Sequence, residues 1–231
     1  LCAGEIDIAD ASRVIKQSEL DACAANGIEV IELPVAADAL TVVVNSGNDW
    51  AQCMSIDELN ALWGPDSTVS TWNQIRPEWP NAPVALFGPG TDSGTFDYFT
   101  EAVNGESGAT RTDFFPSEDD NILVQGVQSD VNALGYFGFA YYAENSSRIK
   151  ALAIDGGNGC VEPTAETTQA GEYTPLGRQL YIYPSAQALE RPEVLEFVNF
   201  YLENVNSIAE QAGFIALTDE QLTESQDKVA A

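Results

Sequence analysis

The most informative segment of this chain reads Phe87-Gly88-Pro89-Gly90-Thr91-Asp92-Ser93-Gly94-Thr95-Phe96-Asp97-Tyr98-Phe99. The apolar run that ends at Phe87 predicts a short strand, and the glycines after it predict a tight turn. Phe96, Phe99 and Val103 then recur at helical spacing, which predicts a helix beginning where the turn ends. We therefore expect a strand, a glycine-rich loop and a helix N-terminus in direct succession.

The same stretch has the composition of an anion-binding loop. The first turn of a helix leaves backbone N–H groups without partners, and the helix dipole adds positive partial charge there. The hydroxyls of Ser93 and Thr95 can converge on the same oxyanion as those N–H groups. A simpler interpretation stands beside this one, in which Asp92 or Ser93 only caps the helix.

The charge balance restricts the classes of partner. Nine Lys and Arg stand against 36 Asp and Glu, which gives a net charge of −27. Because affinity for nucleic acid or an anionic membrane depends on basic side chains, we expect neither partner. A small anion can still bind where local dipoles form the site. The simpler explanation of the net negative charge is solubility in a salty medium. No apolar run approaches the roughly 20 residues that cross a bilayer, so we expect no membrane insertion.

The residue counts also bear on chemistry and compartment. The chain has no histidine, which removes the Ser-His-Asp triad and the commonest metal ligand. We expect no catalytic residue, no metal and no cofactor. The four cysteines, Cys2, Cys23, Cys53 and Cys160, lack the close pairing of zinc or redox sites. Two structural disulfides would place the protein outside the cytoplasm, and four reduced core cysteines are the alternative.

Apolar and capping patterns place the other elements. Strands are predicted near 6–9, 30–33, 40–45, 134–142, 150–154 and 179–183, and helices at 18–25, from Ser55 to Trp63, after Ser117, from Pro192 to Gly213 and from Thr218. The glycine- and threonine-rich segment 155–175 is predicted to be a loop or a hinge. Because strands alternate with helices, we expect an α/β fold with a largely parallel sheet.

The run Gly90–Phe99 resembles the phosphate loop of the PstS family, the extracytoplasmic phosphate-binding proteins of ABC transporters. Further segments resemble the same family in the same order, so that the likeness covers essentially the whole chain. They are Cys2-Ala3-Gly4-Glu5 through Ala11-Ser12-Arg13, the loop from Trp72 to Pro80, Pro116-Ser117-Glu118-Asp119-Asp120-Asn121 and Ala133-Leu134-Gly135-Tyr136-Phe137-Gly138.

This resemblance implies the type II periplasmic-binding-protein fold, in which a two-stranded hinge joins two α/β domains and the anion lies in the cleft. Residues 1–41 and 178–231 are then expected to form domain I, and residues 42–177 domain II. The same layout implies the disulfide pairs Cys2–Cys23 and Cys53–Cys160. Members of the family begin with a strand and a serine- and threonine-rich loop, which this chain lacks, so we expect domain I to be incomplete.

The resemblance also implies a ligand set. Ser93, Gly94 and Thr95 match the residues that line the phosphate. Some members carry an arginine four residues before the serine, where this chain has Pro89. Arg111 is then expected to supply the guanidinium, and Asp92 to hold it in place.

A second departure concerns the aspartate with which some members accept a proton from the bound anion. That position falls on Ser12, with Asp10 nearby. We therefore expect Ser12 to belong to the site, and we expect selection of phosphate over sulfate to work differently in this chain.

The function implied by the resemblance is capture of inorganic phosphate outside the cell and its delivery to an ABC permease, by a monomer. Two alternatives keep the fold: a binding protein for another oxyanion such as sulfate, and a scavenger or sensor of phosphate. A third alternative is a hydrolase or phosphatase with Ser93 as nucleophile. The loop lacks the G-x-S-x-G spacing, because Thr91 stands two residues before Ser93, and no histidine is present to act as base.

Overall fold

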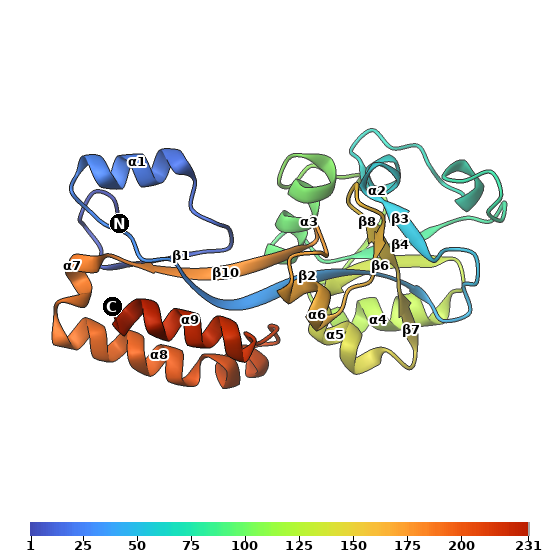
Figure 1. Ribbon diagram of the computed structural model, residues 1–231. Coiled ribbons are helices and arrows are strands. Elements are labelled where there is room, and N and C mark those ends of the chain that lie inside the picture. Colours follow the sequence, from blue (N-terminus) through green and yellow to red (C-terminus); the bar gives the residue numbers. More distant parts are fainter. Residues whose placement is uncertain (231) are drawn as a thin grey trace. The chain divides into compact units, whose positions relative to one another are not determined.

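The computed structural model describes residues 1–230, which divide into two compact units (Figure 1). Unit 1 comprises Leu1–Asp38 together with the chain from Arg178 onward, and unit 2 comprises Ala39–Gly177. The chain passes from unit 1 to unit 2 between Asp38 and Ala39 and back between Gly177 and Arg178.

Unit 1 is a small sheet covered by helices. Its strands are β1 (Ile8–Ala11), the first part of β2 (Leu33–Asn45) and β10 (Gly177–Pro184), in the order β1-β10-β2, and β1 runs antiparallel to β10. Its helices are α1 (Gln17–Ala25), α7 (Ala186–Leu189), α8 (Pro192–Gln211) and α9 (Asp219–Ala230). Val198, Leu202 and Val205 of α8 pack against Leu33 and Ile182 of the strands. The disulfide Cys2–Cys23 attaches the N-terminus to α1, which lies on the other side of these strands (Figure 1).

The main sheet of unit 2 places three parallel strands side by side. Its order is β2-β6-β4-β5, where β6 is Ala133–Gly138, β4 is Ala85–Gly88 and β5 is Phe115–Pro116, and β7 (Ile149–Ala151) also pairs with β2. Phe87 of β4 lies opposite Gly135 of β6 on one side and Phe115 of β5 on the other, both in parallel register. The helices that follow these strands are α5 (Phe139–Asn145), α3 (Gly94–Asn104) and α4 (Asp120–Ser129).

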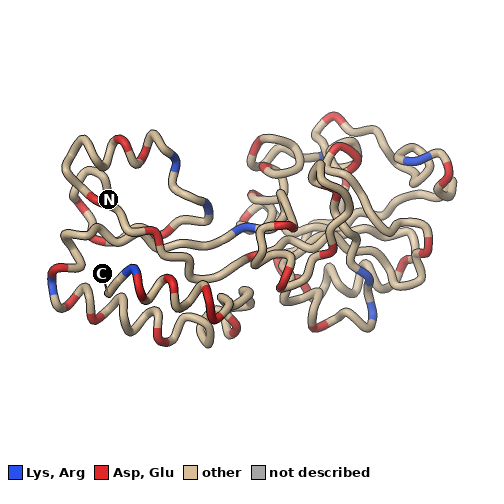
Figure 2. Tube along the Cα trace, viewed as in Figure 1, with Lys and Arg blue, Asp and Glu red and all other residues tan. Residues whose placement is uncertain are grey.

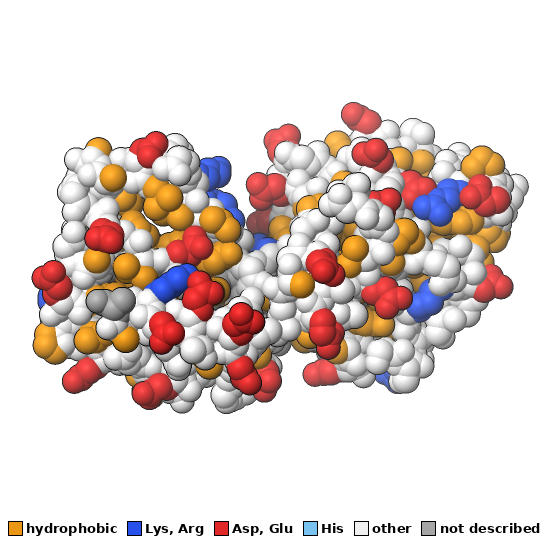
Figure 3. All heavy atoms as spheres, viewed as in Figure 1, with side chains coloured by type: hydrophobic (Ala, Val, Ile, Leu, Met, Phe, Trp, Pro, Cys, Tyr) orange, Lys and Arg blue, Asp and Glu red, His pale blue; other side chains and the backbone are white. Residues whose placement is uncertain are grey.

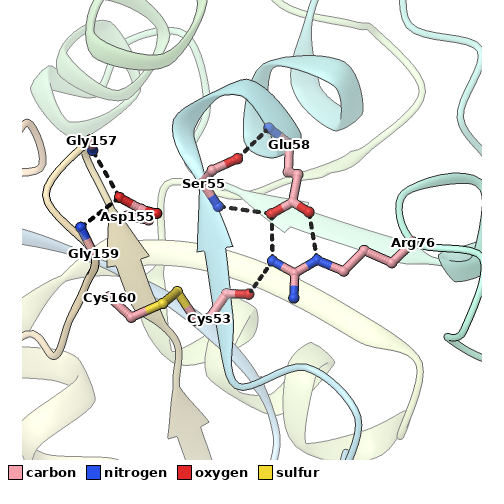
Figure 4. Close-up of a disulfide and its surroundings, with 8 residues drawn as sticks. All are labelled: Cys53, Ser55, Glu58, Arg76, Asp155, Gly157, Gly159 and Cys160. Carbon is pink, nitrogen blue, oxygen red and sulfur yellow. Dashed lines mark hydrogen bonds and ion pairs between the residues drawn. A yellow bond between two sulfur atoms is a disulfide. The ribbon is translucent and has the colours of Figure 1, made fainter.

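A second, three-stranded sheet in unit 2 is held by a disulfide and an ion pair. It contains β3 (Cys53–Ser55), β8 (Ala153–Asp155) and β9 (Cys160–Val161), in the order β3-β8-β9. The Cys53–Cys160 disulfide joins its two outer strands (Figure 4). The Arg76 guanidinium binds both carboxylate oxygens of Glu58 at 2.5 and 2.8 Å and donates to the Cys53 carbonyl at 3.1 Å. The predicted capping box is confirmed, because Ser55 and Glu58 bond reciprocally at the start of α2 (Ile56–Trp63).

The sequence predicted several elements wrongly. The sheet is mixed, because β1–β10, β2–β6, β2–β7 and β8–β9 are antiparallel. The strand expected at 40–45 begins earlier, at Leu33, because pairing with neighbouring strands overrides the weak strand propensity of its alanines. Of the strand expected at 30–33 only Leu33 lies in β2, and Val30 makes an isolated bridge to Ser185. The strand expected to reach residue 142 ends at Gly138, and α5 follows.

One connecting segment also differs from expectation. The segment 155–175 contains β9 and α6 (Ala165–Gln169), whereas a loop or a hinge was predicted. Asp119 caps α4 through a bond from Asn121 N, and the Ser117 hydroxyl accepts from Asp119 N at 3.0 Å. A 3-10 turn, η1 (Trp72–Gln74), lies in the tryptophan-rich loop.

Among residues 1–230, no helix has both the length and the apolar character needed to cross a membrane.

Candidate functional site

The carboxyl ends of three parallel strands in unit 2 lead into helices. β6 runs directly into α5, β4 reaches α3 through residues 89–93, and β5 reaches α4 through residues 117–119 (Figure 1). In open α/β sheets, ligands bind beyond the carboxyl ends of the strands, where the positive ends of the helix dipoles gather. The candidate site is therefore the α3 N-terminus, between the other two helix starts.

The first turn of α3 combines a cap with open donors. Ser93 is the N-cap, and its Oγ accepts a hydrogen bond from Thr95 N at 3.2 Å. Its carbonyl accepts from Asp97 N, also at 3.2 Å. Within residues 1–230, the N–H groups of Gly94 and Phe96 have no acceptor. The capping and anion-binding interpretations are thus compatible, because the cap uses one donor of the first turn and leaves two.

Packed aromatic rings hold α3 in position. Phe99 of α3 stacks on Tyr136 of β6, with ring centroids 3.7 Å apart and an interplanar angle of 11°, and Trp63 packs edge-on against both. Gly88, the last residue of β4, has no room for a side chain, because a Cβ there would lie 2.9 Å from a Tyr136 ring carbon. The loop that follows is thereby fixed to a rigid base.

A carboxylate borders the same loop. Ser117 N donates to the Gly88 carbonyl at 3.1 Å, which sets the start of α4 beside the end of β4. The next residue, Glu118, accepts from Asp92 N through Oε1 at 3.5 Å. Burial, with Asp119 and Glu118 close by, raises the pKa of Asp120 to about 6. The α4 side of the site is therefore acidic, in contrast to the donors of α3.

Arg111 is buried in a different environment from the one expected. Its side chain is 8% exposed and makes a two-pronged ion pair with Asp113, at 2.6 and 2.8 Å. Nη1 donates to the carbonyls of Leu62 at 2.9 Å and Val69 at 2.7 Å. The Arg111 guanidinium holds the pKa of the Asp113 carboxyl below its usual range. Arg111 therefore joins the end of α2 to the loop that follows it.

The structure does not bring Arg111 to Ser93. Arg111 N and Asn104 Nδ2 both donate to the carbonyl of Trp63, at 3.2 and 3.3 Å. Asn104 is the last residue of α3, and a helix of 11 residues is about 16 Å long. Arg111 thus lies near the C-terminal end of α3, and Ser93 caps the opposite end.

The remaining predicted site residues lie in exposed loops. Asp92 is exposed in the loop before α3, while the ion-pair partner of Arg111 is Asp113. Ser12 is exposed in unit 1, directly after β1. It lines, with Asp10, a pocket of about 340 Å³ whose other walls include Leu180 and Tyr201. Among the described residues, no group of three or more His, Cys, Asp and Glu is arranged to hold a metal.

The acidic surface limits how this protein can bind an anion. Acidic side chains are distributed over both units, and basic ones are few (Figure 2). On the face seen in Figure 3 the carboxylates stand mostly singly among uncharged surface. An anion site on such a protein depends on local N–H and hydroxyl donors, because a net charge of −27 repels anions at long range.

Comparisons with known proteins agree on one family. A family model described as a PBP superfamily domain matches residues 1–205. The chain is 50% identical over 222 residues to the protein SphX of a Synechocystis strain, covering 95% of this chain and 66% of SphX. It is 33% identical over 229 residues to the phosphate-binding protein PstS of Staphylococcus saprophyticus, covering 98% of this chain and 70% of PstS.

Solved structures give the same result for the fold. The crystal structure of a possible phosphate binding protein from Planctomyces limnophilus superposes with a TM-score of 0.94 at 47% identity, covering 99% of this chain and 82% of that one. The fold class expected from the sequence is confirmed, as is the presence of two disulfides. The chain spans about two thirds of the length of the SphX protein that it matches. It belongs to the PBP superfamily and, within it, to the family of the PstS phosphate-binding proteins.

Proposed function

We propose that this chain is the binding part of an extracytoplasmic receptor that captures inorganic phosphate and delivers it to an ABC permease. The observation that carries the proposal is the α3 N-terminus, where Gly94 N and Phe96 N have no acceptor among residues 1–230. Relatives named as phosphate-binding proteins support the same ligand. The two disulfides support a location outside the cytoplasm.

The proposed ligand set in unit 2 is Ser93, Gly94 and Thr95, with Asp92 shaping the loop. Hydrogen bonds from neutral N–H and O–H groups to an ionised oxyanion are short and strong, so they can replace part of the water that phosphate gives up. Ser12 of unit 1 is a further proposed contributor. Arg111 is left out of this set, because its guanidinium already binds Asp113 and two carbonyls.

The same geometry favours binding over catalysis. The Ser93 hydroxyl accepts a hydrogen bond from Thr95 N, as a helix cap does. A serine nucleophile needs a base to take its proton, and the chain contains no histidine. We therefore propose a binding protein without enzymatic activity. We also propose that it is a monomer and, because of its net charge of −27, that it has no nucleic-acid partner.

Thermal unfolding with and without inorganic phosphate tests this function. Because a ligand that binds only the folded state raises the unfolding midpoint, millimolar phosphate is expected to raise it in the unmodified protein and much less in Ser93→Ala. Ser55→Ala is the matched control, since Ser55 caps α2 away from the proposed site. It is expected to lower the midpoint through the lost cap and to keep the phosphate-induced rise. An equal rise in both variants would contradict the proposed site, and no rise in the unmodified protein would contradict the function.

A further inference from the structure

The disulfide between Cys53 and Cys160 is open to solvent from one side. Both cysteines line a pocket of about 890 Å³ in unit 2, whose walls include residues of α5 and α6. Cys160 itself is exposed. In the other disulfide, Cys23 is 1% exposed and Cys2 is half-buried. Because thiol–disulfide exchange needs direct access of a thiol to a sulfur atom, the Cys53–Cys160 bond is the more accessible of the two.

The charges of this pocket indicate which reductant it admits. Lys150 lines the pocket and donates from Nζ to the Asn48 carbonyl at 2.5 Å, and burial lowers its pKa. Glu162 and Glu166 line the same pocket and are exposed. Two carboxylates against one ammonium disfavour a reductant that carries a negative charge of its own. A neutral dithiol is therefore the class of reductant that fits.

Little besides the disulfide attaches β9 to the rest of the second sheet. β9 has two residues, and within residues 1–230 it pairs only with β8. The loop before it is held by Asp155, whose Oδ1 accepts from Gly157 N at 2.8 Å and Gly159 N at 3.0 Å (Figure 4). Beyond β9, Thr167 Oγ1 donates to the Glu162 carbonyl at 2.6 Å. Exposed hydrogen bonds and few partners give a segment low local stability, so residues 156–161 are the part that reduction releases.

The loop before β9 contacts the segment that supports α3. Gly156 has no room for a side chain, because a Cβ there would lie 2.1 Å from the Thr174 carbonyl oxygen. The next residue, Pro175, accepts a hydrogen bond through its carbonyl from the Tyr98 hydroxyl at 2.7 Å. Tyr98 lies in the second turn of α3, directly after the turn with the proposed phosphate donors. A path of contacts thus joins the disulfide to the proposed phosphate site.

We propose that the Cys53–Cys160 disulfide is a redox switch, which a neutral dithiol opens through the pocket, and that opening it weakens phosphate binding at α3. A thiolate of the dithiol attacks Cys160 Sγ, the S–S bond breaks, and Cys53 leaves as a thiolate. The second thiolate of the dithiol then displaces Cys160 Sγ. The dithiol becomes a disulfide, and its two electrons and two protons pass to the cysteine pair. The effect on phosphate rests on the proposed function, whereas the exchange itself does not.

Partial reduction of the folded protein tests the exchange. Dithiothreitol serves as the neutral dithiol, N-ethylmaleimide traps the thiols that form, and mass spectrometry of peptides identifies them. We expect Cys53 and Cys160 to be labelled about 10-fold or more faster than Cys2 and Cys23, because their disulfide needs no opening of the fold. Faster labelling of Cys2 and Cys23, or equal rates for the two pairs, would overturn the proposal.

Calorimetric titration with inorganic phosphate tests the switch. Reduction is expected to weaken binding at least about 5-fold, as two coupled sites require, while circular dichroism shows that the fold persists. The matched control is the Cys2→Ser, Cys23→Ser double variant, which is expected to keep this response. The Cys53→Ser, Cys160→Ser double variant is expected to bind weakly with or without dithiothreitol. A reduced protein that binds as tightly as the oxidised one, or that loses its fold, would overturn the switch.

A single variant tests the path without breaking the disulfide. Tyr98→Phe removes the hydroxyl that bonds to Pro175, so we expect weaker phosphate binding in the oxidised protein and a smaller change on reduction. Unchanged affinity together with an unchanged response would overturn the path. An oxidised, unmodified protein that does not bind phosphate would overturn the proposed function, and the order of cysteine labelling would still test the exchange.

Discussion

Arg111 is predicted to support the fold of unit 2 and to leave phosphate affinity unchanged. Arg111→Met keeps most of the side-chain volume and removes every guanidinium donor. The carbonyls of Leu62 and Val69 then lose their Nη1 partner, and an unsatisfied buried carbonyl costs about 1–3 kcal/mol. Asp113, whose side chain is 70% exposed, becomes hydrated at little cost.

The expected loss of stability is about 3 kcal/mol in total, because the Val69 carbonyl is only partly buried. In a protein of this size that loss corresponds to a fall of about 6–12 °C in the unfolding midpoint. Scanning calorimetry measures the midpoint, and titration with phosphate measures the affinity of the same sample. Arg148→Met is the control, because within residues 1–230 the exposed Arg148 guanidinium donates only to Asn145 Oδ1, at 3.3 Å. A large loss of phosphate affinity in Arg111→Met with little change in the midpoint would refute this reasoning.

Two further predictions concern the stability of the protein. The pKa of Asp120 is raised from 3.8 to about 6 by burial and by its acidic neighbours, so the unfolding free energy should fall as the pH rises from about 4 to 6. Asp120→Asn should remove this part of the pH dependence and raise the free energy of unfolding at pH 7 by about 1 kcal/mol, after allowance for solvent screening. Urea unfolding across this pH range measures both effects, and an equally steep fall in the variant would contradict the assignment. Cys53–Cys160 spans 107 residues and Cys2–Cys23 spans 21, so replacing the first pair by serines should destabilise the protein more, by about 4.7 against about 3 kcal/mol. Thermal midpoints of the two double variants measure this order, and a reversed order would contradict it.

Local features of the fold could be predicted from the sequence. The strand, loop and helix around Gly90 follow from short-range periodicity and from glycines, and the Ser55 capping box is a four-residue pattern. Strand direction depends on pairing between distant segments, which is why a largely parallel sheet was predicted. β2 pairs antiparallel with β6 across 90 to 98 residues, and no local pattern near Leu40 or Gly138 indicates that partner.

The candidate site, too, was predictable only where it depends on local sequence. Ser93, Gly94 and Thr95 lie at the helix start that their own sequence predicts. The position of Arg111 depends on the carbonyls of Leu62 and Val69, which tertiary packing brings to its guanidinium. The small number of arginines in the chain therefore could not show where this side chain lies. Glu118 lies in the motif 116–121, but its contact with the loop after β4 arises from the pairing of β4 and β5, which no local pattern indicates. A Cβ on Gly90 would lie 2.0 Å from Glu118 Oε1, and this close approach depends on tertiary packing and not on local sequence.

The backbone N–H of Gly94 gives the most direct test of phosphate binding at the α3 N-terminus. Gly94 is the first helical residue, a Cβ there meets nothing within 4 Å, and Ser93 has the extended conformation (φ −92°, ψ 129°) that a following proline accepts. Gly94→Pro therefore removes one donor while keeping the helix, and Gly94→Ala adds a side chain while keeping the donor.

Calorimetric titration of these two variants with inorganic phosphate is the decisive measurement. If the Gly94 N–H binds phosphate, Gly94→Ala will bind it about 10- to 100-fold more tightly than Gly94→Pro, as expected for one charge-assisted hydrogen bond. Equal affinities in the two variants would contradict binding of phosphate at this helix N-terminus.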